Sequence, residues 1–142
     1  MNKVTKSMKP KIRRGKRKSS KTFKRSFRLL GVNAAGLKSK LASFKKVIAD
    51  LRPSVIFIEE TKYKEEGKIK IGNDFMIYEL VRKNGNGGGG LALGVIKDLN
   101  PCWVSEGEGE VEALSVDIFL KNIKIRCCVA YGPQENDKSE KK

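Results

Sequence analysis

The apolar positions in the first half of the chain form two kinds of pattern, short continuous runs and a helical repeat. Two short apolar runs, "FRLLGVN" (27–33) and "SVIFIEE" (54–60), favour β-strands. Between them, apolar residues recur at helical spacing, with lysines mostly on the other faces: Leu37, Leu41, Phe44, Ile48 and Leu51. The pattern predicts a strand, an amphipathic helix that ends at "RP" (52–53), and a second strand that is buried on both faces, as in a parallel sheet.

The second half of the chain is richer in strand patterns. We predict four further strands, at "DFMIYELV" (74–81), "LALGVI" (91–96), "VEALSVDIFL" (111–120) and "IKIRCCVAY" (123–131). The last two are separated only by "KN", which indicates a hairpin. The sequence therefore predicts an α/β domain with a mixed β-sheet, a flanking helix and a mostly antiparallel second half.

Two low-complexity stretches invite functional interpretations that their context does not support. The run "GNGGGG" (85–90) matches the dinucleotide-binding pattern GxGxxG, but a strand follows it instead of a helix. A hairpin loop with glycines at positive φ is the better interpretation. In "SEGEGEVE" (105–112) the acids fall at period two without the ligand spacing of a calcium loop, so we expect a solvated acidic loop that leads into a strand.

Positive charge is concentrated at the start of the chain. The formal net charge is +15, and residues 1–28 hold 13 of the 31 Lys/Arg and none of the 16 Asp/Glu. We predict a disordered basic tail over residues 1–26, a folded part over 27–137 and a polar end over 138–142. Five tail residues could bind the phosphates of nucleic acid: Arg13, Arg14, Lys16, Arg17 and Lys18. The alternative is a solvated tail that only keeps the chain soluble.

The cysteines and the apolar runs bear on location. Cys102, Cys127 and Cys128 are odd in number and lack CxxC spacing, which favours a reduced intracellular protein. No run approaches the roughly 20 apolar residues of a membrane span, so we expect no membrane partner. The tail also has the composition of a nuclear-import segment, and we expect the protein in the nucleus. The sequence does not indicate an oligomeric state.

Polar residues follow the first two predicted strands where a ligand site is expected. A right-handed crossover through the helix brings Asn33 and Glu60 to the same carboxyl edge of the sheet. Amide and carboxylate oxygens there suit Mg²⁺ or Mn²⁺. Glu59 and Glu60 should point to opposite faces, and the alternative is that one acid faces solvent while the other caps the loop. Tyr131 closes the last strand, either as a donor to a phosphate or as an amphipathic plug.

Four short motifs in order resemble one known family. "LLGVNAAGL", "PSVIFIEETKY", "GGGGLALGV" and "CCVAYGPQEND" look like the amino-terminal half of the endonuclease/exonuclease/phosphatase family. Within that family, the chain is most similar to the apurinic-endonuclease-like domain of non-LTR (LINE-type) retrotransposon polyproteins. The resemblance spans about residues 27–137.

The resemblance implies a four-layer α/β sandwich and Mg²⁺-dependent cleavage of a phosphodiester in DNA. It implies that Glu60 binds the metal beside Asn33, and that Tyr131 contacts the target phosphate or the leaving group. Lys62 and Gln134 then belong to the nucleic-acid contacts. The match is imperfect at two positions, since Glu59 replaces the usual Gln and Gln134 replaces the usual Asn.

A larger departure is an absence. The family's second half brings an Asp/Asn pair and a terminal Asp-His, whereas this chain has no His. The resemblance therefore implies a truncated domain that does not cleave alone, with the second sheet missing and the apolar face of the first sheet uncovered. Two alternatives remain: a non-catalytic nucleic-acid-binding protein that acts through its basic tail, and a phosphatase of the same fold.

Overall fold

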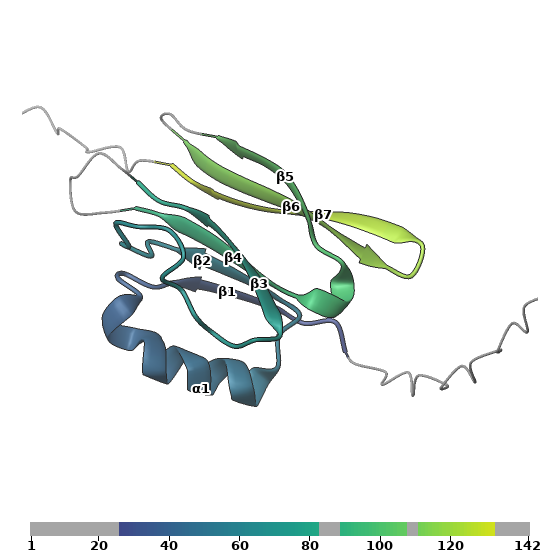
Figure 1. The fold of residues 1–142 in the computed structure, drawn as a ribbon, viewed down its shortest axis with the longest axis horizontal. Coiled ribbons are helices and arrows are strands. Elements are labelled where there is room, and N and C mark those ends of the chain that lie inside the picture. Colours follow the sequence, from purple (N-terminus) through teal and green to yellow (C-terminus); the bar gives the residue numbers. More distant parts are fainter. Residues whose placement is uncertain (1–25, 83–88, 108–110, 133–142) are drawn as a thin grey trace, which may run out of the picture.

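The computed structural model describes residues 26–82, 89–107 and 111–132 (Figure 1). The elements follow in the order β1 (Leu29–Asn33), the 3-10 turn η1 (Lys38–Lys40), α1 (Leu41–Leu51), β2 (Val55–Glu59), β3 (Phe75–Leu80), β4 (Leu91–Ile96), the 3-10 turn η2 (Lys97–Leu99), β5 (Cys102–Gly107), β6 (Glu112–Leu120) and β7 (Ile123–Tyr131). The predicted basic tail, with Arg13, Arg14, Lys16, Arg17 and Lys18, and the predicted contact Gln134 lie outside the described residues.

The first sheet, sheet A, contains strands in the order β1-β2-β4-β3. β1 and β2 are parallel and pair Asn33 with Glu59, and α1 makes the crossover between them. The other pairs in sheet A are antiparallel. The predicted mixed sheet with a flanking helix is thus confirmed.

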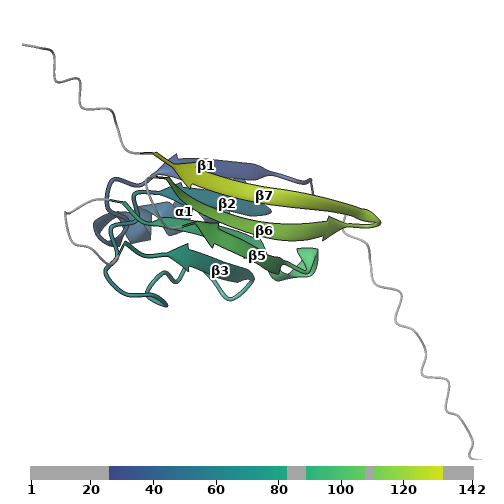
Figure 2. The same cartoon turned by 90° about the horizontal axis from the view of Figure 1, so that it is seen from above.

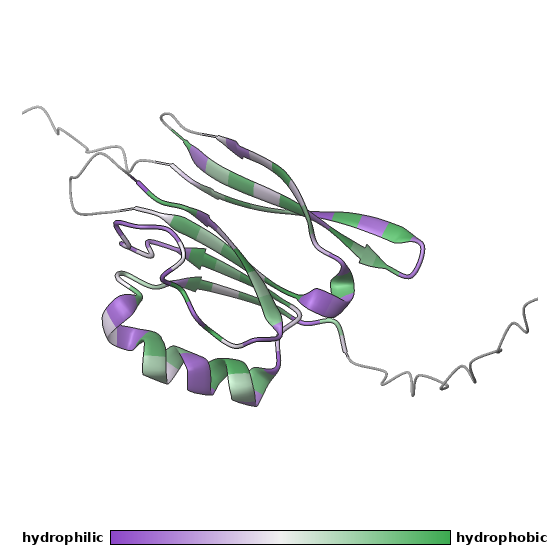
Figure 3. Cartoon of the chain, viewed as in Figure 1, coloured by the Kyte–Doolittle hydropathy of each residue, from purple (hydrophilic) through white to green (hydrophobic). Residues whose placement is uncertain are grey.

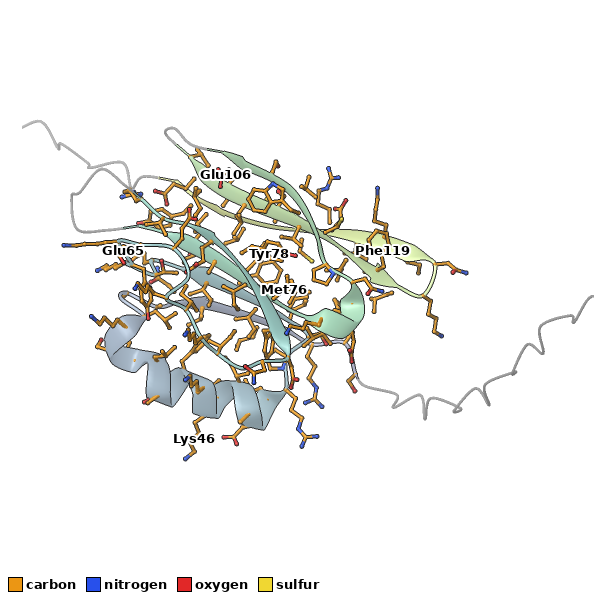
Figure 4. All side chains as sticks on the ribbon, viewed as in Figure 1. Lys46, Glu65, Met76, Tyr78, Glu106 and Phe119 are labelled. Atoms are coloured by element: carbon orange, nitrogen blue, oxygen red, sulfur yellow. The ribbon has the colours of Figure 1, made fainter. Side chains whose placement is uncertain are left out.

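The helix α1 covers one face of sheet A (Figure 1). Its buried residues Phe44 and Ile48 pack with Ile56 and Ile58 of β2, whereas Lys46 points away from the sheet (Figure 4). The helix ends at Arg52, which is left-handed at φ 47° and donates its N–H to the Ile48 carbonyl. This is a common helix ending, and Pro53 follows it, as the predicted "RP" stop requires.

The second sheet, sheet B, has the order β5-β6-β7 and covers the other face of sheet A (Figures 1 and 2). Leu114, Val116 and Ile118 of β6 are fully buried and pack against Leu93 and Val95 of β4. Each contributes roughly 1.5–3 kcal/mol by leaving water. Colouring by hydropathy shows apolar residues along the strands of both sheets (Figure 3).

Sheet B overturns the expectation that the apolar face of sheet A lies uncovered. The cover comes from this chain itself, because the β6–β7 hairpin predicted across "KN" folds back over β4. The prediction also missed β5, since Ser105, Glu106 and Gly107 were assigned to an acidic loop. β5 is an edge strand without a buried residue, so no apolar alternation marks it.

Two further features concern single residues of the sandwich. Cys127 is buried and its neighbour Cys128 is exposed, as residues on opposite faces of β7 must be. Tyr78 of β3 lies between the two sheets and stacks on Trp103 of β5, with ring centroids 6.0 Å apart (Figure 4). In the described ranges no helix is long and apolar enough to cross a membrane.

Candidate functional site

Asn33, Glu60 and Tyr131 meet at one end of the sandwich. Glu60 follows the last residue of β2, Asn33 ends β1 and Tyr131 ends β7. The Glu60 Oε1 atom accepts a hydrogen bond from Asn33 Nδ2 at 3.1 Å and another from the Tyr131 hydroxyl at 3.2 Å. The structure therefore brings together the three residues that the sequence singled out, and it adds the contact from sheet B.

The amide of Asn33 has a defined orientation. Its Oδ1 accepts the backbone N–H of Ala35 at 3.0 Å, a contact that only the oxygen can make. The nitrogen therefore faces Glu60. In this arrangement Asn33 acts as a donor that orients the Glu60 carboxylate, and its oxygen is already engaged by the backbone.

Backbone hydrogen bonds hold the segment around Glu60 from both sides. From the β1 side, the N–H groups of Gly36 and Leu37 donate to the carbonyls of Glu60 and Thr61. From the other side, the carbonyls of Gly90 and Gly89 accept the N–H groups of Thr61 and Lys62 at 3.1 and 3.0 Å. The residues after β2 are thus fixed between two loops.

Glu60 and Lys62 adopt the left-handed conformation, at φ 52° and 55°. This conformation costs a residue with a side chain about 1–2 kcal/mol. It also changes the expected geometry. The strand pattern predicts that Glu59 and Glu60 point in opposite directions from one strand. However, β2 ends at Glu59, and the backbone turn after it directs the Glu60 side chain toward Asn33 and Tyr131.

The electrostatic surroundings keep Glu60 ionised. The hydrogen bond from Asn33 is the largest cause and lowers the pKa of Glu60. Burial is the next largest cause and raises it, and Tyr131, Lys62 and Lys40 each lower it by a smaller amount. The charge of Glu60 in turn raises the pKa of Tyr131. At neutral pH the site therefore presents a carboxylate and a protonated phenol.

The donor set fits a hard cation that keeps most of its water. The Glu60 Oε2 atom makes no hydrogen bond to any described residue. Within the described parts of the chain, no group of three or more His, Cys, Asp or Glu forms a metal cage. Mg²⁺ is often bound by one or two carboxylates together with waters and substrate phosphates, so the single free carboxylate oxygen is compatible with it.

Two basic side chains flank the site. Lys62, which the sequence analysis named as a nucleic-acid contact, is exposed and lies two residues after Glu60. Lys40 was not named; its Nζ donates to the Ala34 carbonyl at 2.7 Å, and its charge acts on Glu60. The helical repeat does not predict this contact, because Ala34 lies before the helix. The chain between Ala34 and Lys40 turns at Ala35 and Gly36, which both have positive φ.

Glu112 belongs both to the predicted strand 111–120 and to the end of the predicted acidic loop 105–112. The structure agrees with the strand, because Glu112 is buried in β6 directly opposite Tyr131. A signal was present, because positions 112, 114, 116 and 118 share one face of a strand. That alternation places Glu112 on the inward face with three apolar residues.

Comparison with known proteins gave structural matches only. No protein-family model matches the sequence, and a search of curated proteins found no match. The endonuclease domain of TRAS1, a telomere-specific non-LTR retrotransposon, is similar in structure with a TM-score of 0.57 and 18% identity, over 75% of this chain and 46% of that one. The AP endonuclease LMAP from Leishmania major has a TM-score of 0.57 and 16% identity, over 74% and 40%.

A third similar structure is the 3′ phosphatase NExo from Neisseria bound to a product DNA hairpin, with a TM-score of 0.52 and 13% identity, over 71% of this chain and 40% of that one. The chain spans less than half the length of each of these three proteins. At these identities the likeness concerns the fold. The structural matches show that this chain adopts part of the endonuclease/exonuclease/phosphatase fold.

Proposed function

We propose that this chain is part of a Mg²⁺- or Mn²⁺-dependent domain that cleaves phosphodiester bonds in DNA. The observation that carries the proposal is the arrangement at Glu60. Two donors, Asn33 and Tyr131, hold one carboxylate oxygen at the end of the sandwich, and the other oxygen is left for a cation. The nuclease fold of the similar structures supports the same reaction class.

The residues of this chain have separate roles in the proposal. Glu60 holds the cation through Oε2, and Asn33 keeps the carboxylate ionised and oriented. When bound, Mg²⁺ would neutralise charge that develops on the phosphate. The phenol of Tyr131 stays protonated next to Glu60, and its single O–H, which donates to Glu60 Oε1 in this structure, can turn to donate to a phosphate oxygen instead. The positive charge of Lys62 favours the approach of a polyanion.

We propose further that these 142 residues do not cleave DNA by themselves. The sequence contains no His to act as general base. Loss of a catalytic base lowers the rate by about 10²- to 10⁴-fold. The lowered pKa of Glu60 makes its carboxylate a weak base, and Tyr131 is already protonated, so neither is suited to accept the proton of the attacking water.

DNA is the substrate that the comparisons favour. The TRAS1 domain is an endonuclease of a retrotransposon, and NExo was captured with a DNA product. The basic segment with Arg13, Arg14, Lys16, Arg17 and Lys18 would add phosphate contacts and favours a nuclear location. Because NExo is a phosphatase of the same fold, removal of a terminal phosphate is the alternative to cleavage within a DNA strand.

The second candidate is a nucleic-acid-binding protein without catalysis. It is favoured by the 13 Lys/Arg within residues 1–28, which hold no acid. The two candidates differ in which part of the chain is required for function. A nuclease-derived site requires Glu60 for cation binding, whereas a tail-mediated binder is indifferent to Glu60.

Mn²⁺ titration followed by NMR tests the first candidate. Mn²⁺ broadens the signals of nearby nuclei, and we expect selective loss of the backbone signals of residues 59–62 in the wild-type chain. Glu60→Gln keeps the size of the side chain but removes its charge and should abolish the selective broadening, whereas Glu59→Gln should retain it. Equal broadening in Glu60→Gln and wild type would refute Glu60 as the metal ligand.

A further inference from the structure

Glu112 is a buried carboxylate next to the site. It is 8% exposed, although Lys, Glu, Arg and Asp are rarely buried without a partner. Its Oε1 accepts a hydrogen bond from Arg82 Nε at 2.5 Å, and its Oε2 accepts the backbone N–H of Gly90 at 3.3 Å. The carboxylate is thus neutralised on one side by an arginine and bound on the other side to a glycine turn.

The glycine turn links Glu112 to the backbone that carries Glu60. Gly89 and Gly90 have φ of +92° and +86°, and their carbonyls accept the N–H groups of Lys62 and Thr61. A Cβ atom on Gly90 would overlap the Thr61 hydroxyl, and one on Gly89 would overlap the Arg82 guanidinium. The turn therefore lies in contact with Arg82 on one side and Thr61 on the other.

The same strand pair supplies Tyr131. Glu112 and Tyr131 are directly opposite each other in the β6–β7 register. Tyr131 donates to Glu60 from β7, while Glu112 reaches the Glu60 segment through Gly90. Sheet B thus contacts the site twice, once through a side chain and once through the glycine turn.

We propose that Glu112 and Arg82 are positioning residues for Glu60. Together they fix the turn at Gly89–Gly90, and the turn holds Thr61 and Lys62 so that Glu60 stays left-handed with its carboxylate between Asn33 and Tyr131. This positioning role rests on the proposed function in one respect: the arrangement serves to present Glu60 to a cation. A buried ion pair that merely stabilises the fold would have no such local effect.

Local and global effects can be separated by comparing two variants of Glu112 in the full chain. Glu112→Ala removes both acceptors, whereas Glu112→Gln retains an oxygen that can accept the Gly90 N–H. We expect Glu112→Ala to accelerate amide exchange at Thr61 and Lys62 by about tenfold or more, and Glu112→Gln to restore most of the protection. Arg82→Met, which leaves Glu112 without its ionic partner, provides a second route if Glu112→Ala does not fold.

Asp117→Asn is the matched control. Asp117 is also a buried carboxylate of β6 paired with an arginine, Arg126, but it is not connected to the glycine turn. We expect the control to leave exchange at Thr61 and Lys62 unchanged. Equal acceleration in all core amides of Glu112→Ala, or the same local change in Asp117→Asn, would overturn the positioning role.

Mn²⁺ broadening gives a readout that a purely structural role would not alter. In Glu112→Ala and Arg82→Met, a severalfold higher Mn²⁺ concentration should be needed to broaden residues 59–62, with Glu112→Gln close to wild type. Unchanged Mn²⁺ dependence in both disruptive variants would contradict the proposal. If wild type shows no selective broadening, the proposed metal function fails, and the amide-exchange result still decides whether Glu112 positions the segment.

Discussion

Tyr131 and Glu60 are 71 residues apart in the sequence and are joined by a hydrogen bond of 3.2 Å. This bond connects the end of the last strand of sheet B with the residue that follows β2 of sheet A. It makes the site dependent on how the two sheets pack. Any change that shifts sheet B relative to sheet A should therefore alter the environment of Glu60 even when no site residue is replaced.

The acidity of Glu60 should depend more on Asn33 than on Tyr131. The Asn33 hydrogen bond is the largest cause of the lowered pKa, and the Tyr131 bond contributes less. We predict that Asn33→Ala raises the pKa of Glu60 more than Tyr131→Phe does. Titration of the Glu60 side-chain carbon by NMR measures both shifts, with wild type as reference. A larger shift in Tyr131→Phe would contradict the order.

The lowered pKa also predicts a pH dependence of stability. A carboxyl whose pKa is lower in the folded state stabilises the fold above its ordinary pKa of 4.5, and this contribution disappears as the pH falls through the lowered value. Glu60→Gln should therefore reduce stability at neutral pH relative to wild type and converge with it in acid. Urea denaturation from strongly acidic to neutral pH tests this. A constant difference over the whole range would show that Glu60 has no such linkage.

Gly90 should resist substitution because both its conformation and its surroundings exclude a side chain. Its φ is +86°, and a Cβ would overlap the Thr61 hydroxyl. We predict that Gly90→Ala costs about 1–3 kcal/mol of unfolding free energy. Gly31→Ala is the control, since nothing lies within 4 Å of a Cβ there. Equal stability of the two variants in chemical denaturation would contradict the geometry of the turn.

The packing of sheet B on sheet A can be tested by truncating single side chains. Leu114 is completely buried between the sheets, whereas Ile123 is 63% exposed at the hairpin end. We predict a loss of about 2–5 kcal/mol for Leu114→Ala and within about 0.5 kcal/mol for Ile123→Ala. Guanidinium denaturation gives both values. A small loss at Leu114 would indicate that sheet B does not cover sheet A in solution.

The contribution of the basic segment to nucleic-acid binding is measurable through salt. Removing residues 1–26 eliminates Arg13, Arg14, Lys16, Arg17 and Lys18. The slope of log affinity against log salt should become shallower by about 0.9 for each duplex phosphate that the segment neutralises in the full chain. Fluorescence anisotropy with a DNA duplex at several salt concentrations measures the slope. An unchanged slope would assign the phosphate binding to residues 27–142, including Lys62.

Part of the site followed from the sequence by local reasoning. The apolar run of β2 and the amphipathic repeat of α1 predicted a strand-helix-strand unit, and the handedness of such crossovers placed Asn33 and Glu60 at one edge. Their hydrogen bond at 3.1 Å shows that they are neighbours, but the sequence predicted two oxygen ligands for a cation, whereas Asn33 turns its nitrogen to Glu60 and its oxygen to the Ala35 N–H. The left-handed turn at Glu60 was not predicted, because Glu has no intrinsic preference for it and the next two residues, Thr61 and Lys62, are hydrogen-bonded to Gly90 and Gly89, about 30 residues away.

Local sequence patterns were sufficient to assign most strands and the helix, and to identify the apolar face of the helix, because these properties depend on neighbours within a few residues. The packing of the two sheets was needed to establish that β5, β6 and β7 cover sheet A, that Glu112 is buried beside Arg82, and that Tyr131 reaches Glu60. Periodicity identifies the face of an element that must be buried, but not the element that will bury it. That choice depends on how all the apolar faces fit together in space.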